Sequence, residues 1–463
     1  MRAIQRFLLN NTTEKLSTKQ WLLFALICSA VFGPGISYSK LYLFHIMLII
    51  NLTYLIFSNF KQTTTSIKEL FSLKHKMNYF FLFSIILFAC WVPFVGSKSH
   101  AIKHLIFISL GFSLTLIIIE QTKKIKDLIF LFRTFAFIYC IDIIIALLEA
   151  LQLIRWPISR LSFNNDLFGR TNEINDILSK TKYHDYVLSM PTTFHWNPNN
   201  FATFALLGLP FLLLHRNFLI SSIGITTIVT LIVAAGSKSA FLSVIVILIL
   251  SLFFIKKRLK NILVLLFVTL FFSTSGFHQL HYKSLKLYEI QSFVYNSIGI
   301  KPPQREALST ITSNPNEGSS NDRIELIKKG FELFKENPFL GVGGGNSKYI
   351  MEQEEGIGIN KLTNLHNFWL ELLVEGGGLY FAIFIVWCLT LILYFFKATI
   401  KKKFSYPLNY FNSTILLAMF GLIISGIGPS SMIFYLPLYL FLGLALSVYH
   451  VSKNNESTSS IRY

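Results

Sequence analysis

Four short clusters of polar residues stand out in this chain of 463 residues, because each lies beside a long apolar run or at the start of a predicted helix. Polar groups are costly to bury beside lipid, so those at the ends of apolar runs are candidates for function. The clusters offer an indole with amides, an ammonium group, a guanidinium group, and an imidazole above two carboxylates. Such groups can hold a sugar, bind an anion and accept a proton.

The first cluster contains Trp196, Asn197, Asn199 and Asn200, directly before an apolar run. Asn is a good helix N-cap, which accounts for one of the three asparagines. An indole face and several amides also suit the binding of a sugar. A helix cap and a sugar-binding site therefore both stay open for this cluster.

Two further clusters each carry a cation. Lys238 lies in a short join between two apolar runs, and Arg323 lies at the start of an amphipathic segment. Lys238 can be an interface residue whose ammonium group reaches water, and Arg323 can be an ordinary surface residue. Beside a helix N-terminus, which attracts anions, both cations are instead suited to bind phosphate.

The fourth cluster contains His366, Asn367, Glu371 and Glu375 and opens the tenth apolar run. Asn367, Glu371 and Glu375 are spaced four residues apart and therefore share one helix face. Three polar groups on one stripe of a membrane helix favour a function, which we predict to be substrate binding. His366 lies beside them and nearer the water, where its imidazole is suited to proton transfer or hydrogen bonding.

Asp142 and Glu149 form a further pair inside the fifth apolar run. They are seven residues apart and share one helix face. A structural ion pair with a partner elsewhere in the chain and a role in chemistry both remain open for them.

Motifs of the common cofactor and metal enzymes are absent from the sequence. It has no Walker loop, zinc motif, serine-hydrolase elbow or Asp-x-Asp pair. The glycine-rich stretch Gly341–Asn346 follows no predicted strand and precedes no Lys-Ser/Thr pair, so we interpret it as a tight turn. The four cysteines lie inside apolar runs without metal-ligand spacing and are predicted to pack as small apolar residues. We therefore expect no metal and no cofactor.

The composition places these clusters in a membrane protein. Hydrophobic residues make up 53% of the chain and charged residues only 14%, whereas soluble domains have about 25% charged residues. This balance excludes a soluble enzyme, a disordered chain and a disulfide scaffold. Because a spanning helix needs about 20 apolar residues, we predict an all-α polytopic fold with about 12 transmembrane helices. The apolar runs lie at residues 19–36, 41–59, 78–96, 102–119, 128–153, 199–215, 217–235, 238–255, 260–277, 366–396, 408–428 and 430–450.

The distribution of basic residues predicts the orientation. With the N-terminus inside, the inner segments contain 22 Lys and Arg residues and the four short outer joins only 4. Positive residues concentrate on the cytoplasmic side, so both termini are predicted to be cytoplasmic. The same distribution accounts for the net charge of +19 without nucleic acid as a partner. All four polar clusters then fall on the outer side of the bilayer.

The predicted topology leaves two long outer segments. The first outer segment covers residues 154–198, and the second outer segment, which we expect to be large and partly helical, covers 278–365. In the second, apolar positions at helical spacing predict an amphipathic helix over Asn321–Lys335. The chain thus divides into transmembrane helices one to nine, the second outer segment, transmembrane helices ten to twelve and a cytoplasmic tail, at residues 1–277, 278–365, 366–450 and 451–463.

Taken in order, the clusters resemble motifs of the O-antigen ligase and polymerase superfamily of bacterial envelope glycosyltransferases. The resemblance covers roughly residues 195–380 by motif, and the whole chain by its spans and its large outer segment. This chain has Lys238 where the superfamily usually has Arg, which keeps the charge but loses bidentate contact with phosphate. The matching stretches are Asn197–Ala202, Gly236–Ala240, Asp322-Arg323, Asn337–Gly343, Leu365–Leu370 and Glu375–Gly377.

The resemblance implies a GT-C-like membrane glycosyltransferase in the inner membrane of a bacterium. Such enzymes move a glycan from a polyprenyl-diphosphate carrier to a hydroxyl of a glycan or lipid-linked acceptor at the outer face. Lys238 and Arg323 would stabilise the leaving diphosphate, so that no metal ion is needed. His366 would take the proton of the acceptor hydroxyl or hold the diphosphate by hydrogen bonds.

Within the superfamily, we expect polymerisation of the repeat units of a surface polysaccharide. The Lys-, Asn-, Ile- and Phe-rich composition indicates an AT-rich genome, as in many bacteria without a lipid core. An O-antigen ligase and an O-linked oligosaccharyltransferase are the alternatives within the superfamily. A transporter of lipid-linked sugars is the alternative from another class, and it would need a polar path through the membrane rather than clusters at one face.

Overall fold

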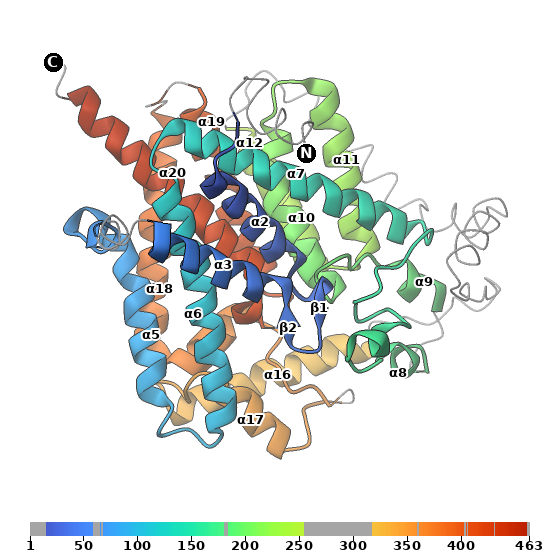
Figure 1. Ribbon diagram of the computed structural model, residues 1–463. Coiled ribbons are helices and arrows are strands. Elements are labelled where there is room, and N and C mark those ends of the chain that lie inside the picture. Colours follow the sequence, from blue (N-terminus) through green and yellow to red (C-terminus); the bar gives the residue numbers. More distant parts are fainter. Residues whose placement is uncertain are drawn as a thin grey trace.

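The computed structural model describes residues 15–58, 65, 68–179, 184–253, 317–358, 361–401, 404, 406–429 and 431–460. These residues form helices joined by turns, together with one two-stranded hairpin, β1 (Ser37–Tyr38) and β2 (Leu41–Tyr42) (Figure 1). The hairpin departs from the predicted all-α fold. It closes within two residues because Ser39 takes a left-handed conformation (φ 52°), which a tight turn requires.

Each predicted apolar run among the described residues contains a helix, while the run at 260–277 lies outside them. The helices are α2 (Thr18–Phe32), α3 (Leu43–Ser58), α5 (Tyr79–Trp91), α6 (Lys98–Gln121), α7 (Ile125–Ala150), α8 (Ile174–Ser179), α9 (His184–Ser189), α10 (Pro198–Leu213), α11 (Phe218–Ala234), α12 (Lys238–Ser251), α16 (Glu317–Glu336), α17 (Asn346–Gln353), α18 (Phe368–Ile400), α19 (Leu408–Ser425) and α20 (Leu436–Ser460). Short 3-10 turns are η1 (Gly33–Gly35), η2 (Leu73–Asn78), η3 (Asn165–Phe168) and η6 (Met432–Phe434).

Several of these helices suit a membrane. Among the described residues, five are long and apolar enough to span a bilayer, namely α6, α7, α18, α19 and the Leu436–Glu456 part of α20. Shorter apolar helices include α3, α10, α11 and α12. The chain is therefore a mostly helical, polytopic membrane protein, and twelve spans remain a prediction.

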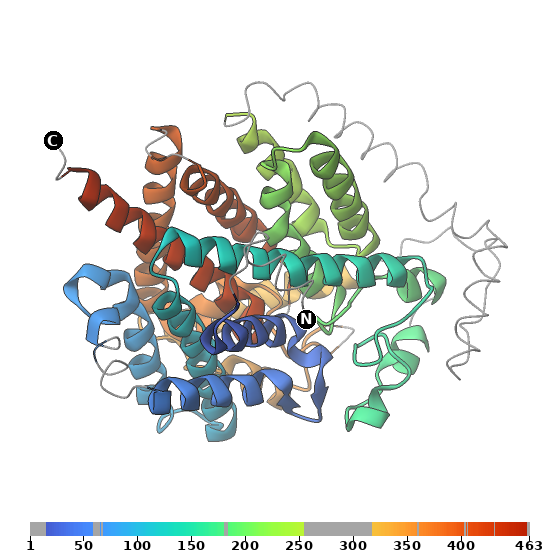
Figure 2. The ribbon, with the colours of Figure 1, turned by 45° about the horizontal axis from the view of Figure 1, so that its top comes forward.

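The helix α20 runs through the centre of the bundle, and 94% of its most apolar 18-residue stretch is buried. It packs against α6, α2, α7 and α19, and α3 lies beside α2 (Figure 2). Gly111 of α6 faces the ring of Tyr439, since a Cβ there would lie 2.5 Å from the ring. This close approach lets Thr115 donate a hydrogen bond of 2.9 Å to the Tyr439 carbonyl.

Two helices of the second outer segment, α16 and α17, cover one end of the bundle, and the C-terminal end of α20 lies at the opposite end (Figure 1). The helix predicted over Asn321–Lys335 is α16, which extends further in both directions. A small apolar core separate from the main one joins α16 and α17 to the start of α18. Its buried members are Leu326, Leu333, Val342, Met351, Leu365, Leu370 and Val374.

The long helix α18 is broken at Gly377, which takes an extended left-handed conformation (φ 73°, ψ 174°). Residues 338–345 run along this break: the N–H of Val342 bonds the carbonyl of Val374 at 2.9 Å. A Cβ on Gly341 would lie 2.5 Å from the nitrogen of Gly377, so the approach requires glycine. Within the glycine-rich stretch Gly341–Asn346, the predicted turn is confirmed at residues 344–345, and the same stretch lies against the helix break.

Candidate functional site

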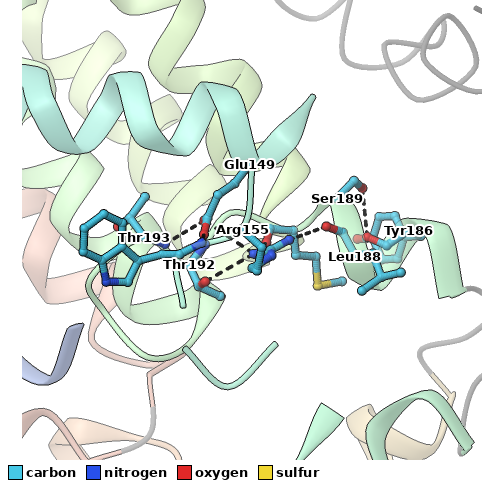
Figure 3. A network of polar contacts seen from close by, with 9 residues as sticks. Glu149, Arg155, Tyr186, Leu188, Ser189, Thr192 and Thr193 are labelled. Carbon is cyan, nitrogen blue, oxygen red and sulfur yellow. Dashed lines mark hydrogen bonds and ion pairs between the residues drawn. The ribbon is translucent and has the colours of Figure 1, made fainter. Parts of the chain in front are cut away.

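Glu149 holds the first outer segment at the end of α7 (Figure 3). The buried carboxylate accepts backbone N–H bonds from Trp156 at 2.8 Å and from Thr192 and Thr193 at 2.7 Å. Arg155, whose side chain is 9% exposed, adds an ion pair of 3.4 Å. A buried carboxylate with this many partners is stabilised in place. Of the two roles open for Glu149, the structural ion pair is present in the fold.

A buried polar chain joins the start of α10 to the start of α20. The hydroxyl of Tyr435 donates to the carbonyl of Asn200 at 2.8 Å and lies 3.3 Å from Nδ1 of His195. On the other side of the ring, Nε2 of His195 lies 3.3 Å from a carboxylate oxygen of Asp142. The end of the first outer segment is thereby fixed against the central helix.

The first polar cluster lies at the start of α10. Asn197 caps this helix, because its side-chain oxygen accepts the N–H of Asn200 at 2.9 Å, so the cap interpretation is confirmed for Asn197. Asn199 is half-buried, and the buried Oδ1 of Asn200 has no hydrogen-bond partner among the described residues. Trp196 takes a left-handed conformation (φ 65°), with its ring 4.9 Å from the guanidinium of Arg170.

His366 lies two residues before the first residue of α18 and is half-buried. It takes a left-handed conformation (φ 48°). Asn367 caps the helix, since its Oδ1 accepts the N–H groups of Trp369 at 3.1 Å and Leu370 at 3.3 Å. The N–H of Phe368 bonds the carbonyl of Gly426 at 2.9 Å, which fixes the start of α18 to the end of α19. The position of His366 is thus set by bonds on the residues that follow it.

Arg323 comes from α16 and lies on the helix face that packs against α18. Gly330, seven residues later on the same face, would place a Cβ 2.6 Å from Leu370 and 3.2 Å from Leu365. Arg323 is half-buried, and this burial lowers the pKa of its guanidinium. Within the part of the chain that the structure describes, Arg323 makes no ion pair, so its positive charge is not neutralised there.

The charges of two arginines act on His366. The pKa of His366 is lowered to about 4, first by burial and then by the positive charges of Arg323 and Arg160. Its imidazole is therefore neutral at pH 7 and has a nitrogen lone pair available for a proton. Arg323 belongs to the second outer segment and Arg160 to the first, so charges from both segments act on His366. Arg160 lies in none of the sequence motifs, so residue type and spacing do not distinguish it.

Lys238 is the first residue of α12, and its side chain is exposed. The hydroxyl of the adjacent Ser239 lies 3.5 Å from the carbonyl of Ser425, one residue before the partner of Phe368. The start of α12 therefore lies at the same end of the bundle as the start of α18. Among the described residues, the ammonium group of Lys238 makes no ion pair or hydrogen bond with His366 or Arg323.

Glu371 and Glu375 are buried in α18, and both have protein partners. Oε1 of Glu371 accepts a hydrogen bond of 2.5 Å from the hydroxyl of Ser431, on the connection between α19 and α20. Glu375 accepts one of 2.5 Å from Ser347 of α17, and its other oxygen lies 3.1 Å from Nδ1 of His104 in α6. The two carboxylates hold neighbouring segments in place, and a role in substrate binding stays a prediction.

An apolar cavity lies between α5, α6, α18, α19 and α20 and extends to the start of α18. Its lining on α18 includes Phe368, Leu372, Phe384 and Ile392, on both sides of the break at Gly377. The lining consists of aromatic and aliphatic side chains, including Trp369 and Trp387, with one thiol at Cys388. Such a lining favours an apolar ligand over a charged solute.

Residues 223–385 match the family described as O-antigen ligase. The matched region includes the start of α12, α16 and the first half of α18, and with them Lys238, Arg323 and His366. This match confirms the resemblance to the O-antigen ligase and polymerase superfamily. No curated protein matches the chain. The first outer segment, with Arg160 and Trp196, precedes the matched region.

Proposed function

We propose that this protein is a membrane glycosyltransferase that moves a glycan from a polyprenyl-diphosphate carrier to an acceptor hydroxyl at the outer face. One observation carries the proposal: α16, which carries Arg323, packs against the start of α18, beside His366. The charge of Arg323 lowers the pKa of that imidazole. A transfer of this kind needs a proton acceptor beside an anion-binding group, since a hydroxyl loses its proton while a diphosphate leaves. The family match supports the same class of reaction.

In the proposed reaction, the acceptor oxygen forms a bond to the anomeric carbon as the bond from that carbon to the diphosphate oxygen breaks. His366 accepts the proton of the acceptor hydroxyl. The diphosphate leaves with the electron pair of the broken bond, and the positive charges of Arg323 and Lys238 stabilise it, so that no metal ion is needed. A hydrogen bond from His366 to the diphosphate is the alternative role for this residue.

We assign glycan binding to the start of α10 and tail binding to the apolar cavity. The indole of Trp196 can stack against a sugar ring, and the unpartnered amide oxygen of Asn200 can accept a hydrogen bond from a sugar hydroxyl. The cavity begins at Phe368, two residues after His366, and its apolar wall suits an isoprenoid tail. The same apolar wall speaks against a transporter, which would need polar groups along a path through the membrane.

The proposed orientation has both termini in the cytoplasm and α16 and α17 outside, in the inner membrane of a bacterium. The distribution of basic residues supports it. The test uses single cysteines in a background without the four native ones. A membrane-impermeant thiol reagent added outside should label Lys361→Cys, beside α17, and spare Lys76→Cys in η2. Labelling of Lys76→Cys alone would reverse the orientation.

Polymerisation of repeat units is the activity we propose, and chain transfer by a ligase is the second candidate because the matched family is described as O-antigen ligase. The test is deletion of the gene followed by electrophoresis of the surface glycan and of the lipid-linked glycan. Single repeat units left on the carrier identify a polymerase, and full-length chains left on the carrier identify a ligase. Unchanged surface glycan would contradict both.

A second measurement tests the chemistry. The purified protein is given a polyprenyl-diphosphate glycan and an acceptor, with and without a metal chelator. Transfer in both conditions is the expected result. Loss of transfer with the chelator would contradict the metal-independent mechanism.

A further inference from the structure

The helix α16 has apolar side chains on two of its faces. One face packs into the small apolar core through Leu326 and Leu333. On the other face, Ile324, Ile327 and Phe331 are exposed, although all three are large and apolar. They lie three and four residues apart and therefore form one apolar stripe along the helix. An exposed stripe of this kind marks a contact surface.

The charged residues around the apolar stripe are sorted by sign. Successive residues of a helix are about 100° apart, so Lys328 and Lys335 form a line directly beside the stripe. Glu325 and Glu332 form the next line, farther from it. The two lysines are exposed and make no ion pair among the described residues. A helix at a membrane surface has this order, with its apolar face among the acyl chains and its lysines at the lipid headgroups.

The C-terminal end of α16 meets α18 just after the break at Gly377. A Cβ on Gly378 would lie 3.9 Å from the ring of Phe334. Phe334 follows Ile327 by seven residues and Phe331 by three, so it lies at the edge of the apolar stripe. The stripe therefore leads directly to this part of α18.

From this point onward, α18 carries a row of exposed apolar side chains. The helix is long enough to span a bilayer, and only 33% of its most apolar 18-residue stretch is buried, so the row faces lipid. The N–H of Leu379, the first residue of the row, donates to the carbonyl of Phe339 at 3.2 Å, and Phe339 is itself 78% exposed. Phe339 thus extends the lipid-facing row towards α16. The row consists of Leu379, Ile383, Val386 and Leu393.

We propose that the apolar stripe of α16 lies on the bilayer surface, among the ends of the acyl chains, with Lys328 and Lys335 at the lipid phosphates. The bilayer is the partner that the stripe and the lipid-facing row of α18 share. Figure 1 shows α16 running across the direction of α18, as a helix in the membrane plane does when α18 spans the membrane. The proposed orientation puts this contact in the outer leaflet.

The contact would also hold Arg323 at the level of the lipid headgroups. Arg323 lies four residues before Ile327 and therefore next to the apolar stripe. A lipid-linked diphosphate lies at the same level, so the donor would reach Arg323 from within the membrane. This last step rests on the proposed function, whereas the bilayer contact does not.

The test measures the surroundings of single side chains in the full-length protein, in liposomes of phosphatidylcholine and phosphatidylglycerol. Each variant carries one cysteine with a nitroxide label, in a background without the four native cysteines. Electron paramagnetic resonance then compares the access of oxygen, which concentrates among acyl chains, with that of a water-soluble nickel chelate.

The labels at Ile327→Cys and Phe331→Cys should favour oxygen over nickel several-fold, as should the label at Val386→Cys in the lipid-facing row. Glu332→Cys is the matched control. Glu332 is adjacent to Phe331 and also exposed, but it lies on the acidic line, so its label should favour nickel.

A preference for nickel at Phe331→Cys equal to that at Glu332→Cys would place the apolar stripe in water and overturn the proposal. Low access of both reagents would overturn it as well, because another protein segment or a second copy of the chain would then cover the stripe. Neither measurement depends on glycan transfer. A protein that shows the expected labelling and transfers no glycan would contradict the proposed function alone.

Discussion

Arg155 of the first outer segment and Arg323 of the second differ in their burial and in their protein partners. In the first, Arg155 is almost completely buried and paired with Glu149, whose carboxylate also accepts three backbone N–H bonds. In the second, Arg323 is half-buried and makes no ion pair among the described residues, although it lies beside His366. A buried charge with protein partners stabilises the fold, whereas a charge without such partners is available to bind a ligand.

The attachment of each segment explains this difference. Polar bonds at Glu149 anchor the first segment, so its buried charges are used in the fold. The second is anchored by the small apolar core around Leu370 and by the close packing of Gly330. Apolar contacts hold α16 in position without involving the charge of Arg323. A segment fixed in this way can present a cation to a substrate.

His366→Ala should have the largest effect on transfer. Loss of a general base lowers turnover about 10²–10⁴-fold, while thermal stability should change little, because the imidazole makes no hydrogen bond within the described part of the chain. The measurement is glycan transfer per purified protein, together with thermal denaturation. His215→Ala, at the other end of α10, is the control. Near-normal transfer in His366→Ala would remove this residue from the mechanism.

The comparison of Arg323 with Arg155 is tested by making the same substitution in both segments. Arg323→Gln should lower turnover about 10²–10³-fold with unchanged thermal stability, because a donor to the leaving anion is lost. Arg155→Gln should lower the free energy of unfolding by about 3–5 kcal/mol, because Glu149 loses its buried counter-ion. Transfer per folded molecule should stay closer to normal in Arg155→Gln. Equal losses of stability in the two variants would break the contrast between the segments.

Lys238 adds a third cation to the comparison. Its side chain is exposed at the start of α12, and it makes no ion pair among the described residues. If it stabilises the diphosphate, Lys238→Ala should reduce transfer about 100-fold while expression stays intact, and Lys238→Arg should keep much of the activity. Lys238→Gln should behave like Lys238→Ala. Normal transfer per purified protein in Lys238→Ala, with a lower membrane yield, would identify an interface residue instead.

The smallest expected effect concerns pH. A protonated imidazole cannot accept a proton, so kcat/KM should fall as the pH drops towards about 4, the pKa of His366. The positive charge of Arg323 lowers this pKa, and its removal must raise it. In Arg323→Gln the residual activity should therefore begin to fall at a higher pH than in the native protein. A shift to lower pH would contradict the proximity of the two groups.

The sequence by itself determined the class of the protein and most of its helices. The length of an apolar run and the composition along it are local properties, and a backbone in lipid must satisfy its own hydrogen bonds, so the runs predicted the helices. The amphipathic spacing over Asn321–Lys335 predicted α16 for the same reason. Residue type alone singled out Lys238, Arg323 and His366, because charged or titratable groups beside membrane helices are rare and costly.

Only the tertiary structure decided which polar groups have partners. The spacing of Glu371 and Glu375 indicated a shared helix face, but their partners come from other segments. Ser431 and Ser347 donate hydrogen bonds to these carboxylates, and His104 lies 3.1 Å from Glu375. In the same way, no spacing connects Asp142 to His195, whose Nε2 lies 3.3 Å from its carboxylate. Contacts between residues far apart in the chain depend on how whole helices pack, and local sequence does not encode that arrangement. The packing of the helices therefore decides which charges are paired within the protein and which stay available to a substrate.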